Sequence, residues 1–345
     1  MTAGVTDRSV LTSGRDVSTE TEGAASSSKH PRRLTAALRA REVQLLLLIL
    51  VVAATISVLT PNFLTESNLK SVAMGMTYNL IVALGMTYVL ILGGIDLSVG
   101  SNVALSGIVA TLLLQMGVVS VPVAICIGLG VGMTIGAING FVITRYRINS
   151  FVVTLGMMSL ARGVAMVLTS GYFVTGLPES FLIIGQGEVF GIPFPVIASL
   201  FIVVVFHFLL KNWLPLSRGF HVGANPDYAE LLGIGVKKSI FVAYALCGLL
   251  CGITAMFMCS RLGMGYAQFG LEMELMALGA AVIGGASFSG GRGSIWGTFL
   301  GVLLLALINN GFVLMDASIY WQKVVNGTIV IIAIATAARH AKARG

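Results

Sequence analysis

The stretch VAMGMTYNLIVALGMTYVLILGGIDLSVGS, residues 72–101, combines two features that decide the fold class. Residues 72–92 form an apolar run of the length that an α-helix needs to cross a hydrocarbon layer of about 30 Å. The run ends at Gly93 and Gly94, and Asp96 follows just before the next apolar run. Because a carboxylate is costly inside a membrane, we expect Asp96 at a polar turn or in a protein-lined position with a specific role.

The composition of the whole chain is typical of a membrane protein. Its 345 residues are 56% hydrophobic and 10% charged, whereas a soluble domain is about half apolar and about one quarter charged. Apolar stretches near 20 residues recur, and the alternating segments of about 10 residues that build a transmembrane barrel do not occur. The sequence therefore predicts an all-α polytopic membrane protein.

About ten transmembrane helices are expected from the apolar runs. They are residues 43–60, 72–92, 101–117, 120–143, 150–169, 194–210, 240–259, 272–288, 294–313 and 321–338. We expect three regions: a disordered basic tail over 1–42, a transmembrane domain over 43–338, and a short tail over 339–345.

The distribution of basic residues predicts that both termini are cytoplasmic. With ten spans and an inside N-terminus, all but four of the 21 Lys and Arg residues fall in segments on the cytoplasmic side. The positive-inside rule requires such a bias. The exceptions are Lys70, Arg162, Arg261 and Lys323. We therefore interpret the net charge of +7 as topology, and we expect no nucleic-acid partner.

The longest inside loop, 211–239, contains the signal of a short helix over Pro226–Leu232. Asn225 suits the N-cap, Pro226 suits the first helical position, and a following glycine would end the helix. This segment is too short and too polar to span a membrane. We expect it at the cytoplasmic face, either as a connecting helix or as a docking surface for a cytosolic partner.

Motifs for catalysis and for nucleotide binding are absent. GIGVKKS, residues 233–239, only imitates a phosphate-binding loop, because Lys237 does not directly follow the second glycine. No zinc-binding or dinucleotide-binding spacing occurs, and the spans contain few ionisable groups. We therefore expect no catalytic, cofactor or metal site in this chain, and we do not expect an enzyme.

The candidate residues for a translocation pathway or a helix break are small, polar or charged residues in or beside the apolar segments. They are Gly93, Gly94, Asp96, Ser98, Asn139, Arg162, Glu274, Asn309 and Asn310. Uncharged amides suit a neutral polyhydroxy solute, and they suit hydrogen bonding between helices equally well. Arg162, near the middle of its span, needs a cavity or an acidic partner, for which Asp96, Glu272 and Glu274 are candidates.

Residues 284–291 repeat part of the pattern of residues 93–100. GGIDLSVG (93–100) and GGASFSGG (284–291) share the pattern G-G-x-x-x-S-x-G, either by repetition or by chance in glycine-rich text. The first copy fits a cytoplasmic turn or a break in a helix inside the protein. In both cases we expect Asp96 or Ser98 to cap the next helix, and we favour this structural role over substrate binding.

Four blocks of sequence, in order, resemble the membrane-spanning permease subunits of bacterial ABC importers of the ribose type. They are GGIDLSVGS (93–101), NGFVITRYRINSFVVTLGMMSLARG (139–163), GANPDYAELLGI (223–234) and ELMALGAAVIGGASFSGGRGSIWGTFLGVLLLALINNGF (274–312). The resemblance implies a noncatalytic pore-forming subunit in the bacterial inner membrane. It also implies three partners: a cytosolic ATPase with two nucleotide-binding modules, an extracytoplasmic sugar-binding protein, and a second permease copy or paralogue. ATP and Mg would bind in the ATPase.

The resemblance assigns the loop at about 218–239 as the segment that contacts the ATPase. Positions that keep the family pattern are Gly223, Asn225, Ala229, Gly233 and Ile234. Positions that depart from it are Ala224, Tyr228, Glu230 and Leu232. Glu230 replaces a basic residue, which puts the local electrostatic contact with the ATPase in doubt.

The function expected from the residues and the resemblance together is ATP-driven import of a monosaccharide or a sugar-like polyol. An ion-coupled secondary transporter of a small neutral solute is the alternative. It would need acidic residues placed for coupling, whereas Asp96, Glu272 and Glu274 lie near the ends of spans. The sequence names neither the sugar nor the choice between homodimer and heterodimer.

Overall fold

The computed structural model describes residues 41–342, with side chains described for residues 41–335. The helices are α2 (Arg41–Leu59), α3 (Glu66–Ile91), α4 (Val99–Gln115), α5 (Val121–Tyr146), α6 (Ser150–Thr169), α7 (Glu179–Gln186), α8 (Phe194–Asn212), α9 (Leu214–Ala224), α10 (Pro226–Leu231), α11 (Val236–Leu262), α12 (Met273–Ile283), α13 (Ile295–Leu314) and α14 (Ile319–Lys342). Two short antiparallel strands, β1 (Glu188–Val189) and β2 (Ile192–Pro193), pair Glu188 with Pro193 and Val189 with Ile192. The expected all-α class is confirmed, and the tail expected over 1–42 lies outside the described residues except for its last two.

Within the described residues 41–342, seven helices are long and apolar enough to cross a membrane: α2, α3, α5, α6, α8, α11 and α13. The other three expected spans coincide with shorter apolar helices, α4, α12 and the described apolar part of α14. The expectation for 272–288 is wrong over residues 284–288, because α12 ends at Ile283. Its 11 residues extend about 16 Å, roughly half of a hydrocarbon layer. The helix ends there because Gly285 has a φ of 109°, which glycine adopts readily.

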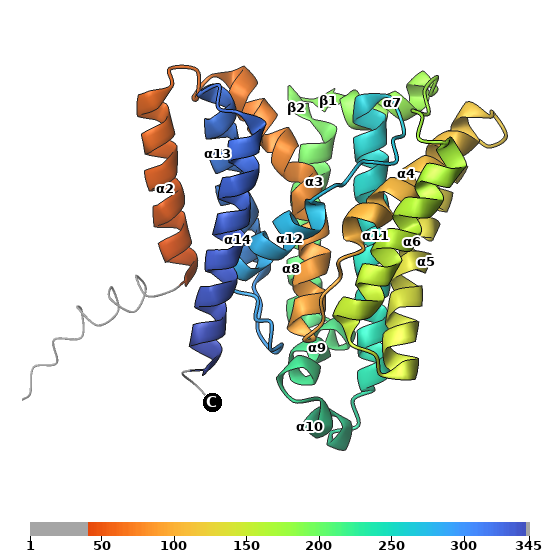
Figure 1. Ribbon diagram of the computed structural model, residues 1–345, viewed down its shortest axis with the longest axis vertical. Coiled ribbons are helices and arrows are strands. Elements are labelled where there is room, and N and C mark those ends of the chain that lie inside the picture. The colour runs from red at the N-terminus through yellow and green to blue at the C-terminus, as the bar shows by residue number, and fades with distance from the viewer. Residues whose placement is uncertain (1–40, 343–345) are drawn as a thin grey trace, which may run out of the picture.

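The core is built around α3 and α11, which are the most deeply buried of the long helices. Figure 1 shows α2, α13 and α14 on one side of α3 and α4, α5 and α6 on the other side. Small residues bring α5 and α11 together: a Cβ atom at Gly252 would lie 2.9 Å from the Cα of Leu129, and one at Gly140 would lie 2.9 Å from the Cα of Phe241. Close approach at small residues is how helices associate in lipid.

The two ends of the helical bundle differ. The start of α2, the end of α14, α9 and α10 lie at one end, and α7 with the β1–β2 hairpin lies at the other (Figure 1). One helix was expected in the loop 211–239, and the structure adds α9, with proline in its first turn. The last helix continues to Lys342, past the expected end at 338.

Candidate functional site

The segment between α3 and α4 is a break inside the protein and not a simple turn at its surface. Gly93, with a φ of 81°, ends α3, and the amide of Gly94 donates to the carbonyl of Val89 over 3.0 Å. The chain then rises from the lower end of α3, and α4 begins near the middle of the bundle (Figure 1). Asp96 and Ser98 in this segment are buried. Of the two arrangements left open for residues 93–100, the structure has the helix break.

The Asp96 carboxylate holds this break in shape. Its Oδ1 accepts from the backbone N–H of Ser98 over 2.9 Å and from the Ser98 hydroxyl over 2.6 Å. Asn139 of α5 donates to the same hydroxyl over 2.9 Å. The expectation that Asp96 or Ser98 caps α4 is wrong: Ser98 occupies the N-cap position without a side-chain cap bond, and Asp96 closes the turn before it. Asp96 is 1% exposed, so its carboxylate serves an internal hydrogen-bond network.

Two neighbouring helices hold the same segment from outside. The Tyr244 hydroxyl of α11 donates to the Ile95 carbonyl over 3.0 Å, and the Ile95 amide donates to the Ser150 hydroxyl of α6 over 3.2 Å. Gly94 is required for this approach, because a Cβ there would lie 2.5 Å from the Tyr244 hydroxyl oxygen. Four helices, α3, α5, α6 and α11, therefore converge on the break.

The matching stretch, residues 284–291, forms a second break, between α12 and α13. The Ala286 amide donates to the Ala281 carbonyl over 2.9 Å, the same bond to the fifth preceding residue that Gly94 makes. Such a bond is the mark of a Schellman ending with a left-handed glycine. That glycine is Gly93 in the first break and Gly285 in the second. The two breaks touch, because the Gly291 amide donates to the Ile91 carbonyl over 2.8 Å.

The first residues of α2 form hydrogen bonds on both sides of the second break, at the end of α12 and at the start of α13. The Arg41 guanidinium donates to the carbonyls of Val282 and Ile283, over 2.7 and 3.2 Å. Both carbonyls lie at the C-terminal end of α12, where a cation is favourable. Glu42 accepts from the Ser294 hydroxyl over 2.6 Å, and Ser294 is the N-cap of α13.

The end of α9 fits against both breaks. Gly223 is buried, and a Cβ at this position would overlap the Ile91 carbonyl oxygen and lie 2.6 Å from the Gly291 amide nitrogen. Gly290, with a φ of 77°, also packs against Gly223, because a Cβ atom at Gly290 would lie 2.9 Å from the Gly223 Cα. The loop between α8 and α11 is therefore in direct contact with both broken segments.

The short helix α10 confirms the local prediction made for it. The Asn225 side chain accepts from the Tyr228 amide over 2.9 Å, as an N-cap does, and Gly233, with a φ of 74°, follows the helix. Ala229 is fully buried, whereas Tyr228 and Glu230 are exposed. Leu231, 84% exposed, and Leu232 add apolar surface next to them. The helix is thus anchored on one side and presents a mixed apolar and acidic surface on the other.

Arg162 of α6 binds backbone carbonyls. Its Nη1 donates to the carbonyls of Ala267 and Phe269 over 2.5 and 2.7 Å, in the segment that leads into α12. Of the three acidic candidates, Glu274 is the one whose charge interacts with Arg162. Glu272 instead pairs with Lys323 over 2.7 Å. The Glu274 Oε2 atom is buried and has no hydrogen-bond partner among the described residues.

The paired asparagines of α13 join helices. Asn310 and Asn68 of α3 exchange two hydrogen bonds, of 2.7 and 3.1 Å. Asn309 accepts from the Asn326 amide of α14 over 2.9 Å. The sequence left two roles for these amides, hydrogen bonding between helices and solute binding. In the structure Asn309 and Asn310 each have a partner on another helix.

A cavity of about 650 Å³ lies between α3, α12 and α14, and none of the candidate pathway residues expected from the sequence lines it. Its polar lining residues are Tyr78, Asn79, Glu272, Lys323 and Asn326, and its walls are mostly apolar. The sequence shows Asn79, Glu272 and Asn326 as polar residues in or beside spans. No local signal brings them together, because they come from three helices that are distant in the chain.

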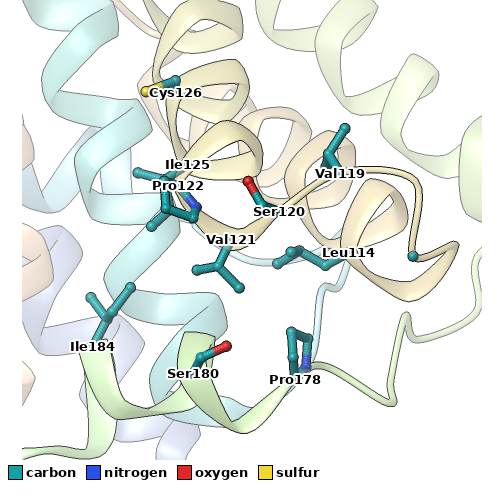
Figure 2. Close-up of a pocket in the computed structure, with 11 residues that line it drawn as sticks. Leu114, Val119, Ser120, Val121, Pro122, Ile125, Cys126, Pro178, Ser180 and Ile184 are labelled. Atoms are coloured by element: carbon teal, nitrogen blue, oxygen red, sulfur yellow. The ribbon is translucent and has the colours of Figure 1, made fainter.

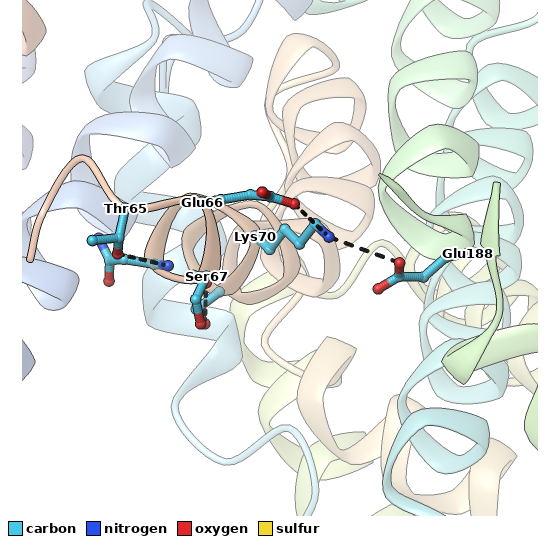
Figure 3. A network of polar contacts seen from close by, with 7 residues as sticks. Thr65, Glu66, Ser67, Lys70 and Glu188 are labelled. Atoms are coloured by element: carbon cyan, nitrogen blue, oxygen red, sulfur yellow. Dashed lines mark hydrogen bonds and ion pairs between the residues drawn. The ribbon is translucent and has the colours of Figure 1, made fainter. Parts of the chain in front are cut away.

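The end of the bundle opposite α9 and α10 is ordered by the segment 170–193. Lys70 of α3 lies 3.0 Å from Glu66 and 3.8 Å from Glu188 of β1, so the hairpin is tied to the start of α3 (Figure 3). A groove of about 910 Å³ runs between α7 and the turn from α4 to α5. Figure 2 shows its lining, with Pro178 and Ser180 facing Val121 and Leu114.

Comparison with known proteins identifies relatives along most of the chain. Residues 68–334 match the family described as "Branched-chain amino acid transport system / permease component". The ribose import permease protein RbsC of Escherichia coli K12 is 37% identical over 297 residues, which cover 85% of this chain and 92% of RbsC. The L-arabinose permease AraH of Azospirillum brasilense is 34% identical, over 84% of this chain and 85% of AraH. The D-allose permease AlsC of E. coli is 33% identical, over 83% and 88%. No solved structure matches the chain.

Proposed function

The chain belongs to the family of branched-chain amino acid transport system permease components, and we propose that it is the membrane-spanning subunit of an ATP-driven importer of a monosaccharide or sugar-like polyol. The observation that carries the substrate class is the similarity, over more than four fifths of the chain, to permeases for ribose, L-arabinose and D-allose. These relatives favour the ABC importer over the ion-coupled transporter. The protein is a multi-pass protein of the bacterial inner membrane.

In the proposed topology the chain crosses the membrane ten times with both termini in the cytoplasm. The helices α4 and α12 contribute partial crossings that begin or end within the protein. The end of the bundle with α9 and α10 is then cytoplasmic, and the end with α7 and the hairpin is extracytoplasmic (Figure 1). The basic residues of the inside segments support this orientation.

The proposed coupling surface is α10 and the end of α9. A cytosolic ATPase, in which ATP and Mg bind, would contact the exposed side of α10 at Tyr228, Glu230 and Leu231. Movement of α10 would reach Gly223 directly, since α9 ends at Ala224 and the cap residue Asn225 joins the two helices. From Gly223 it would reach the segments after α3 and after α12, both of which touch that glycine. The chain itself contributes no catalytic residue.

The other proposed partners bind elsewhere. A sugar-loaded binding protein would dock on the extracytoplasmic end, where α7 and the hairpin form an ordered surface. A second permease copy or a paralogue would complete the membrane assembly. The binding protein would set much of the sugar specificity.

The test is sugar uptake by the complete complex in vesicles, with ribose, L-arabinose and D-allose supplied to its binding protein. We expect uptake of at least one of them that requires ATP hydrolysis by the partner. Uptake that persists without hydrolysis, or that collapses with an ionophore while ATP remains high, would support the ion-coupled alternative instead.

A further inference from the structure

We propose that the cavity between α3, α12 and α14 is the site where the transported sugar is held within the permease, with Asn79 and Asn326 as its hydrogen-bonding groups. The inference rests on the proposed function, and it adds a location and two contact residues. The cavity has a volume of about 650 Å³, which is in the usual range of about 300 to 1,000 Å³ for small-molecule sites. Mostly apolar walls with a few polar groups are typical of such sites.

The two amides present free hydrogen-bonding groups of both kinds. Asn79 lines the cavity, and no hydrogen bond joins its side chain to any described residue. Asn326 also lines the cavity. Its amide nitrogen donates to Asn309, and its Oδ1 is a buried acceptor without a partner among the described side chains, which a ligand would reach by a turn of the Asn326 side chain toward the cavity. An unpaired polar group within a membrane protein is costly. A hydroxyl group satisfies both, because it donates to an amide oxygen and accepts from an amide nitrogen.

The charged residues at the cavity indicate that it contains water and takes a neutral solute. Glu272 and Lys323 form an ion pair of 2.7 Å with side chains that are 54% and 56% exposed. Glu272 precedes α12, which starts near the middle of the bundle (Figure 1). Exposed charges at that depth are unfavourable against lipid, so they face an aqueous space or another protein subunit. The pair neutralises itself, which leaves the lining with no net charge to select an ion.

The place of the cavity also suits transport. Met273 and Met276 of α12 form part of its wall, and the same helix ends at the break that touches Gly223 through Gly290. A displacement of the coupling loop would therefore reach the cavity wall through one short helix. Such a connection is what alternating access requires of a binding site.

The experiment measures sugar molecules imported per ATP hydrolysed, in vesicles containing the complete complex and the panel of ribose, L-arabinose and D-allose. Asn79→Leu keeps the side-chain size and removes the amide without breaking a side-chain hydrogen bond among the described residues. We expect Asn79→Leu to lower the ratio about fivefold, the effect of one ordinary hydrogen bond. Asn326→Leu also removes the bond to Asn309 and should lower the ratio at least as much. Stimulation of the ATPase by loaded binding protein should stay within about twofold of wild type, because assembly is intact. The matched control, Thr328→Leu, exchanges an exposed residue of α14 that lies outside the cavity lining and should leave the ratio unchanged.

A second measurement tests whether the cavity contains water. In a Cys126→Ser background, which removes the exposed one of the four cysteines, Leu275→Cys on the cavity wall should react with a membrane-impermeant thiol reagent. Leu160→Cys, on the exposed surface of α6, should react at least tenfold more slowly. Equal rates at the two positions, or wild-type import ratios in both asparagine variants, would overturn the site. Absence of ATP-dependent import by the wild-type complex would instead refute the proposed function.

Discussion

Replacing Gly223 by alanine tests the contact through which the coupling loop reaches the two helix breaks. The added Cβ would overlap the Ile91 carbonyl oxygen and approach the Gly291 amide nitrogen to 2.6 Å. These two groups bond to each other over 2.8 Å, so the methyl group separates the two breaks. Both are backbone groups, which cannot move aside as a flexible side chain can.

The magnitude follows from two losses. Overpacking of a tight site costs about 1–3 kcal/mol, and the lost hydrogen bond adds about 1 kcal/mol. We therefore expect Gly223→Ala to lower stability by about 2–4 kcal/mol. Where the protein accommodates the methyl group by moving α9, the cost appears as lost coupling: loaded binding protein stimulates the ATPase less, and fewer sugars enter per ATP.

The assay combines thermal unfolding in detergent, followed by tryptophan fluorescence, with the import ratio in vesicles. Gly156→Ala is the control, because a Cβ at this position on α6 meets nothing within 4 Å and alanine is favoured in a helix by about 0.5–1 kcal/mol. Wild-type unfolding together with a wild-type import ratio for Gly223→Ala would refute the reasoning.

Three further substitutions test the remaining contacts. Asp96→Asn should keep most of the transport, because an amide oxygen still accepts from Ser98, whereas Asp96→Ala should cost about 1–3 kcal/mol in thermal unfolding; equal behaviour of the two would contradict the hydrogen-bond role. Arg162→Met should lower both the unfolding temperature and the uptake rate, because the carbonyls of Ala267 and Phe269 lose their side-chain donor. Unchanged values would show that these two hydrogen bonds are dispensable. Asn225→Ala removes the cap of α10, worth about 1 kcal/mol, and should reduce ATPase stimulation while the unfolding temperature of the transmembrane helices stays nearly constant; full stimulation would remove α10 from the coupling surface.

Local chemistry explains what the sequence predicted well. The expected spans coincide with helices because length and apolarity are properties of continuous segments. The helix α10 was predicted almost to the residue, since Asn225, Pro226 and Gly233 specify its start and its end within a few positions.

Features that depend on distant contacts could not be predicted in the same way. Apolar residues continue past Gly285, so the span expected from hydropathy ran beyond the true end of α12. Asp96 was expected to cap a helix because capping is the commonest local use of such a residue. Its actual partners depend on how Asn139 and Ser98 meet in the fold.

The candidate pathway residues show the same limit. Asn309 and Asn310 stood out as neighbouring amides in an apolar helix, but their partners, Asn326 and Asn68, come from other helices. Asn79 was no more conspicuous in the sequence than they were. What distinguishes it in the structure is the lack of a partner among the described residues and its place in a cavity.

The proposed function requires this chain to conduct a sugar across the membrane at the expense of ATP hydrolysed by a partner subunit. The most direct measurement is uptake of radiolabelled ribose, L-arabinose or D-allose by vesicles that contain the permease, the ATPase and the loaded binding protein. We expect that at least one sugar accumulates against its gradient with active ATPase, and that accumulation stops when the ATPase carries a hydrolysis-deficient substitution. Continued accumulation with the inactive ATPase would contradict it.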